Sequence, residues 1–180
     1  MTIQALWIAF QTIVLREIRR FTRIWPQTLL PPAVTMTLYF IIFGNLIGSR
    51  IGDMGGYDYM QFIVPGLIMM AVITNSYANV VSSFFSMKFQ RSIEELLVSP
   101  VPNWTILAGY VAGGMARGLS IGLIVTLLSL AFTQLSIHNL PMVVITVFLT
   151  SALFALCGFI NAMLATKCDD ISIVPTFVLT

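Results

Sequence analysis

Charged residues are scarce in this chain of 180 residues, at 9% of the sequence against 58% apolar residues. So little polar surface could not keep a globule of this size dissolved in water, which excludes an ordinary water-soluble domain. A lipid bilayer is therefore the expected solvent. The basic residues leave a net charge of only +2 and form no patch interleaved with aromatic residues, so no nucleic acid is expected as a partner.

Residues that perform catalysis or bind metals are equally few. The two cysteines, Cys157 and Cys168, match neither a disulfide framework nor a metal-binding spacing. His138 is the single histidine, and no carboxylate lies near it in the sequence. A membrane enzyme needs a nucleophile with a base or a cluster of metal ligands, so no catalytic or metal residue is assigned, and an intramembrane enzyme is a weak alternative.

Long uncharged runs predict membrane-spanning helices. Asp, Glu, Lys and Arg are absent from Ile24 to Ser49, Tyr59 to Met87 and Gly118 to Thr166. A helix needs about 20 apolar residues to cross a bilayer, and the last run is long enough for two crossings. We therefore predict an all-α protein with four full spans, near residues 28–47, 61–87, 104–133 and 141–166.

A further apolar run, Ile171 to Thr180, is too short to cross a bilayer and predicts the start of a fifth span. A helix that stopped there would leave backbone carbonyl groups without partners in hydrocarbon. We therefore expect the chain to be the N-terminal part of a longer membrane protein, with a transmembrane domain over residues 26–180 that is incomplete at its C-terminus.

The basic residues are distributed unevenly between the predicted spans. Eight of the nine fall on one side of the membrane: Arg16, Arg19, Arg20, Arg23, Lys88, Arg91, Arg117 and Lys167. Only Arg50 falls on the other. Because cytoplasmic loops carry an excess of Lys and Arg, the N-terminus is predicted to be cytoplasmic.

Residues 1–25 predict an amphipathic helix at the cytoplasmic surface of the membrane. Its apolar part, Ile3 to Leu15, is too short to span, and the charges follow it, whereas a signal peptide has its charges first. Four arginines recur at intervals of three and four residues, on one face of this helix: Arg16, Arg19, Arg20 and Arg23. That face is expected to meet lipid headgroups or to dock a partner.

The third predicted span carries glycines at four-residue intervals: Gly109 with Gly113, and Gly114 with Gly118 and Gly122. Small residues at this spacing let helices approach closely in lipid, so these five are assigned to helix packing. Arg117 lies among them, well inside an apolar segment. It is a candidate for contact with an anionic substrate group on a pathway, with lipid headgroups or with an acidic neighbour.

The loop after the second predicted span predicts a short, rigid helix on the cytoplasmic side. Ser92 and Glu95 match a capping box, in which each side chain binds the other residue's backbone amide. Pro100 and Pro102 end the helix within two turns. Exposed carboxylates on such a helix suit the transmission of movement from a soluble partner. A surface helix paired with Arg91 or with lipid is the alternative.

Two segments resemble the signatures of ABC-2 type transport permeases, in the family's order and spacing. They are YMQFIVPGL at residues 59–67 and RSIEELLVSPV at residues 91–101. The resemblance covers essentially the whole chain. It implies six spans in the intact subunit and pairing of two subunits, most simply as a homodimer, in the bacterial inner membrane.

The resemblance also implies a function. Permeases of this family form the translocation pathway of ATP-driven exporters, and a separate ABC subunit binds and hydrolyses the ATP. No Gly-Lys-Ser/Thr motif surrounds either lysine of this chain, so no cofactor is expected in the permease itself. By resemblance, the ATPase couples through the short helix, at Arg91, Ser92, Ile93, Glu94, Glu95, Leu96 and Leu97. The basic N-terminal helix would be a second docking element.

A secondary transporter or a channel is the main alternative. Those proteins usually place acidic residues or broken helices near the middle of the membrane for ion coupling. The predicted spans contain no such acidic residue, and the sequence has no convincing inverted repeat.

Overall fold

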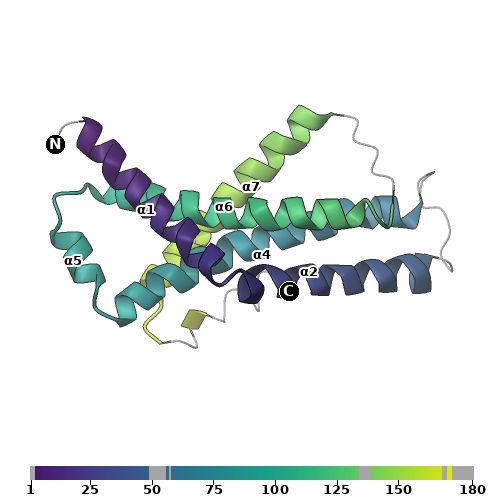
Figure 1. Cartoon of the computed structure of the whole chain (residues 1–180), viewed down its shortest axis with the longest axis horizontal. Coiled ribbons are helices and arrows are strands. Elements are labelled where there is room, and N and C mark those ends of the chain that lie inside the picture. The colour runs from purple at the N-terminus through teal and green to yellow at the C-terminus, as the bar shows by residue number, and fades with distance from the viewer. Residues whose placement is uncertain (1–2, 49–55, 57, 134–138, 168–169, 172–180) are drawn as a thin grey trace.

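The computed structural model describes residues 3–48, 56, 58–133, 139–167 and 170–171, and the elements assigned there are all helices. An N-terminal helix, α1, is followed by the four long helices α2, α4, α6 and α7, and the short helix α5 lies between α4 and α6 (Figure 1). In chain order the elements are α1 (Ile3–Arg23), α2 (Trp25–Ile41), the π-helix η1 (Ile42–Gly48), α4 (Tyr59–Phe89), α5 (Ile93–Val98), α6 (Asn103–Ser129) and α7 (Leu140–Leu164).

The prediction of four spans in an all-α protein is confirmed. The helices that are long and apolar enough to cross a membrane are Trp25–Gly44, Tyr59–Phe89, Asn103–Ser129 and Leu140–Leu164. The third ends at Ser129 rather than at the predicted residue 133. There the amides of Ala131 and Phe132 bind carbonyl groups three residues back, which tightens the last turn and ends the α-helix.

Helix α4 is the centre of the packing. It contacts both α6 and α7 along much of its length, and α6 in turn contacts α1 and α2. In Figure 1, α2, α4 and α6 run side by side along the long axis, whereas α7 crosses them obliquely. Helix α1 lies obliquely near one end of this bundle, the end at which α5 joins α4 to α6. Movement of α5 would therefore reach α4 and α6 first.

Two apolar clusters hold the helices together. One joins Val80 and Phe84 of α4 to Tyr110 of α6 and Phe159 of α7, and Ile13 brings α1 into it. The rings of Phe84 and Phe159 lie 4.5 Å apart between centroids. The other cluster joins α2 to α4 and α6 through Met36, Phe40, Val64, Ile121 and Val125. The first cluster thus fixes α1 at the end of the bundle that carries α5.

The five glycines of α6 lie on two faces of that helix. Gly109 and Gly113 face α1, where an added Cβ would lie 2.6 Å from Ile13 Cγ2 and 2.5 Å from Glu17 Cβ, respectively. The other three face α4, at Val72, Ser76 and Val80: they are Gly114, Gly118 and Gly122. The backbone of α6 therefore approaches both neighbours more closely than any residue with a side chain would allow.

Two side chains hold the end of α7. The Lys88 ammonium group donates hydrogen bonds to the carbonyl oxygens of Met163, at 2.8 Å, and Ala165, at 2.7 Å, which stabilises the C-terminus of the helix. Beyond it, the carboxylate of Asp170 accepts hydrogen bonds from the amide groups of Lys167 and Thr166 and from the Thr166 hydroxyl. These bonds lower the pKa of Asp170. The turn is therefore held by an ionised carboxylate.

Gly118→Ala should weaken the contact between α4 and α6. The new methyl group would overlap Ser76 Oγ and lie 2.9 Å from the carbonyl oxygen of Val72, so a helix must move. Overpacking of this kind costs about 1–3 kcal/mol. Thermal unfolding of the purified protein in detergent, followed by size-exclusion chromatography, should show a lower midpoint.

Gly66→Ala is the matched control, because Gly66 lies within α4 and an added Cβ there would meet nothing within 4 Å. Its midpoint should equal or exceed that of the parent protein, since alanine favours a helix more than glycine does. Equal midpoints for the two variants would contradict the close approach of α4 and α6.

Candidate functional site at the junction of α1, α4 and α6

Helix α1 buries a face that the sequence analysis did not single out. Ile13, Glu17 and Phe21 are its buried residues, and their four-residue spacing places them on one side of the helix. Of the four arginines, Arg16 and Arg20 form hydrogen bonds with neighbouring helices, whereas Arg19 and Arg23 are exposed without such a described contact. The predicted basic face is thus divided between a protein contact and the surface.

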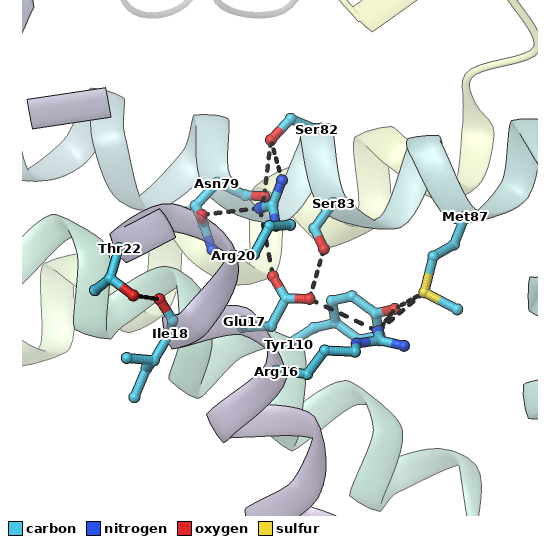
Figure 2. A network of polar contacts seen from close by, with 10 residues as sticks. All are labelled: Arg16, Glu17, Ile18, Arg20, Thr22, Asn79, Ser82, Ser83, Met87 and Tyr110. Carbon is cyan, nitrogen blue, oxygen red and sulfur yellow. Dashed lines mark hydrogen bonds and ion pairs between the residues drawn. The ribbon is translucent and has the colours of Figure 1, made fainter. Parts of the chain in front are cut away.

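Glu17 is the buried charge at this contact, with only 1% of its surface exposed. Its Oε1 atom accepts a hydrogen bond of 2.6 Å from the Ser83 hydroxyl of α4. Its two carboxylate oxygens also form ion pairs with Arg16, at 3.7 Å, and with Arg20, at 3.4 Å (Figure 2). A carboxylate so far from water is stable only when such partners surround it.

The two arginines extend these contacts to both neighbouring helices. Arg20 donates from Nη2 to the backbone oxygen and to Oδ1 of Asn79, each at 2.9 Å. Arg16 donates to the Tyr110 hydroxyl of α6 at 2.6 Å and to the Met87 sulfur of α4 at 2.9 Å (Figure 2). We call this set the α1 junction: Arg16, Glu17, Arg20, Asn79, Ser83 and Tyr110. It attaches α1 to α4 and α6 by charge as well as by packing.

Several buried polar atoms at the α1 junction have no hydrogen-bond partner. They include Glu17 Oε2, Arg20 Nε and Asn79 Nδ2. Buried polar groups in folded proteins are almost always hydrogen-bonded. The α1 junction therefore keeps two donors without a hydrogen bond, while Glu17 Oε2 has only its ion pair with Arg20.

A groove opens beside the α1 junction, between α1 and the end of α4. Its volume is about 780 Å³. We call it the basic groove, because all four arginines of α1 line it: Arg16, Arg19, Arg20 and Arg23. The facing wall comes mainly from α4 and combines polar groups with apolar surface; it contains Ser83, Ser86, Met87, Gln90 and Ser92.

Arg117 is half-buried in α6, and its Nε atom is buried without a hydrogen-bond partner. In the part of the chain that the structure describes, it forms no ion pair, so the acidic neighbour considered above is not found there. Its charged neighbour is Arg20, with which it experiences repulsion. Arg117 therefore adds positive charge near the α1 junction.

The short helix is present as α5, but its predicted capping box is wrong. Ser92 has φ −70° and ψ −11°, already helical, and makes no side-chain capping bond. A capping serine needs a more extended backbone. Arg91 instead turns the chain, with a left-handed φ of 57°, and its carbonyl oxygen accepts from the Glu94 amide at 3.4 Å. Glycine favours that conformation, so Arg91 is strained there.

The described side chains of α5 lie on two sides of the helix. Glu94 and Glu95 are exposed in the first turn, whereas Ile93 and Leu96 pack against the apolar cluster around Phe84. The Leu97 side chain lies outside the described residues. Helix α5 is therefore anchored to the bundle on one side and presents two carboxylates on the other.

In the described ranges, no three His, Cys, Asp or Glu residues are placed to share an ion. Cys157 is exposed on α7. His138 and Cys168 lie outside the described residues.

Glu17→Ala should destabilise the protein by about 3 kcal/mol, because it leaves the guanidinium groups of Arg16 and Arg20 without their carboxylate. Glu17→Gln keeps a partner for Ser83 and should cost less. Thermal unfolding in detergent measures both. Gln11→Ala, at an exposed position of α1, is the control and should be neutral. Equal stability of Glu17→Ala and Gln11→Ala would show that the α1 junction does not hold the helix.

Comparison with known proteins identifies the family. The sequence profile described as ABC-2 type transporter matches residues 8–180. The inner membrane transport permease YadH of Escherichia coli K12 is 64% identical over 174 residues, which cover 97% of this chain and 68% of that relative. The same identity and coverage are found for the permease YadH of Shigella flexneri.

A more distant similarity extends over the same region. Nodulation protein J of Neorhizobium galegae is 23% identical over 179 residues, which cover 97% of this chain and 66% of that relative. No solved structure matches the chain significantly. Because the profile and the relatives both match nearly the whole length, this chain belongs to the ABC-2 type transporter family.

Proposed function

We propose that this chain forms the membrane pathway of an ATP-driven exporter and that a separate ABC ATPase drives it through α5. Membership of the family makes the chain a transport permease of the inner membrane. The observation that supports the proposal is α5 itself, a short helix that is anchored between α4 and α6 and exposes Glu94 and Glu95. ATP is expected in the partner, since the chain lacks a phosphate-binding motif.

The route from α5 into the membrane is short. Three residues connect α4 to α5, and Pro100 and Pro102 stiffen the connection of α5 to α6. The apolar anchors Ile93 and Leu96 press on the cluster around Phe84. A force applied to the carboxylate face of α5 would therefore move the ends of α4 and α6 together, rather than bend a loop.

Helix α1 offers a second point of contact on the same two helices. At the α1 junction, side chains of α1 bind Ser83 and Asn79 of α4 and Tyr110 of α6. If the ATPase also touches the basic helix α1, as the family resemblance implies, the force reaches the same part of the bundle. Exchange of partners at the unpaired atoms of the α1 junction would accompany this movement.

A second copy of the chain is the proposed partner within the membrane. Helices α2 and α7 leave most of their apolar surface uncovered, with 17% and 22% of their most apolar segments buried, against 50% for α4. These outer faces are available to lipid, to the rest of the subunit and to a second subunit. Closure between two subunits would then open the pathway to one side of the membrane at a time.

The orientation that we propose places α5 and the N-terminus in the cytoplasm, in line with the excess of basic residues on that side. In a variant without native cysteines, Asp58→Cys and Phe89→Cys each place a thiol at an exposed position, at opposite ends of α4. A membrane-impermeant maleimide added to intact spheroplasts should label Asp58→Cys and spare Phe89→Cys. The opposite pattern would reverse the topology.

Glu94→Lys combined with Glu95→Lys should reduce co-purification of the ATPase with the full-length permease at least tenfold. Two reversed charges at the centre of a docking surface replace attraction by repulsion, which costs several kcal/mol. The amount of ATPase recovered per permease from mild detergent is the measurement.

Asp58→Lys is the matched charge-reversal control, because Asp58 is exposed at the opposite end of α4. It should leave recovery of the ATPase unchanged. Full recovery with the Glu94 and Glu95 variant, at normal membrane insertion, would refute the docking role of α5.

A further inference from the structure

We propose that the basic groove binds the phosphate headgroup of an anionic phospholipid from the adjacent membrane leaflet. The inference rests on the groove between α1 and α4 and does not depend on the ATPase. Four observations carry it: the charge balance, the free donors, the size of the groove and the apolar flank of α1.

Charge in the basic groove is strongly unbalanced. Its lining contains four arginines and a single acidic residue, Glu17. The Glu17 carboxylate already pairs with Arg16 and Arg20. In the described chain the side chains of Arg19 and Arg23 have no ion pair or hydrogen bond, and the neighbouring Arg117 adds repulsion. An anion in the groove would neutralise this excess.

The donors in the groove suit a phosphate ester. Guanidinium groups bind phosphate oxygens with two parallel N–H bonds, and the exposed ends of Arg19 and Arg23 are free to do so. On the opposite wall, the Ser86 hydroxyl oxygen accepts from Gln90 Nε2 at 3.3 Å, which leaves its hydrogen free to donate. Phosphate oxygens would thus find donors from both α1 and α4.

The size of the groove indicates more than an isolated phosphate. Its volume of about 780 Å³ is within the range of roughly 300–1,000 Å³ that organic ligands occupy. A headgroup with its glycerol backbone would fill such a space, whereas inorganic phosphate would fill a small part of it.

The flank of α1 places the basic groove at the depth of lipid headgroups. Ile8 and Leu15 are more than half exposed on the side of α1 that borders Arg19, and Trp7 and Trp25 are also more than half exposed. Exposed tryptophan and aliphatic side chains beside arginines are typical of helices that lie in the membrane interface. Lipid tails would cover this flank while the headgroup enters the groove, whereas a soluble partner would leave the flank in water.

Native mass spectrometry of the full-length protein tests the inference. The protein is released from detergent micelles that contain palmitoyl-oleoyl phosphatidylglycerol or the corresponding phosphatidylcholine, and the retained lipid is counted. We expect preferential retention of phosphatidylglycerol. Arg19→Gln and Arg23→Gln should each weaken it about fivefold, the effect of one basic residue at an anionic surface. Both side chains are exposed and have no described ion pair or hydrogen bond, so both variants should fold normally.

Lys167→Gln is the matched control, since it removes one exposed positive charge outside the lining of the groove and should leave retention unchanged. Equal loss in this control, or no loss in the arginine variants, would overturn the proposal. Equal thermal stabilisation by inorganic phosphate and by phosphatidylglycerol would assign the groove to a free anion instead. Loss of ATPase recovery with unchanged lipid retention in the arginine variants would assign it to a protein partner.

Discussion

The position of α1 depends on the burial of Glu17. A carboxylate with 1% exposure is tolerated only because Ser83, Arg16 and Arg20 surround it, and those partners come from two different helices. Gly113 lies directly beneath it on α6 and admits its side chain. Without this pairing, only apolar contacts such as those of Ile13 would hold α1 against the bundle. With it, the helix has one register against α4 and α6.

The same arrangement explains why the functional elements gather at one end of the bundle. Helix α5 joins the ends of α4 and α6, the α1 junction holds α1 against them, and Lys88 attaches the end of α7. All four helices therefore respond to displacement at this end. Close packing along α6, where glycines face both α1 and α4, makes the bundle move as a unit rather than deform. Such joint movement is what the proposed coupling to an ATPase would require.

The proposed binding of a phospholipid headgroup in the basic groove would bring a membrane lipid into contact with α1. Two of the arginines belong to the α1 junction and two are free, so a bound headgroup would link the surface of α1 to its buried charges. The proposed ATPase contact at α5 would use carboxylates, whereas the proposed lipid contact in the groove would use guanidinium groups. The two contacts can therefore be separated by mutation.

Composition and pattern alone determined the all-α class, the four spans and the short helix between α4 and α6, because hydrophobic length and helical spacing are local properties. They also located the five glycines and the four arginines. Tertiary structure decided what these residues face. Glu17, a single acid among arginines, gave no separate signal in the sequence. Its spacing of four residues from Ile13 and from Phe21 could nevertheless have indicated that it is buried. The backbone of Arg91 likewise decided that Ser92 would not cap α5. Partners and turn conformations depend on helices far apart in the chain, and no local pattern encodes them.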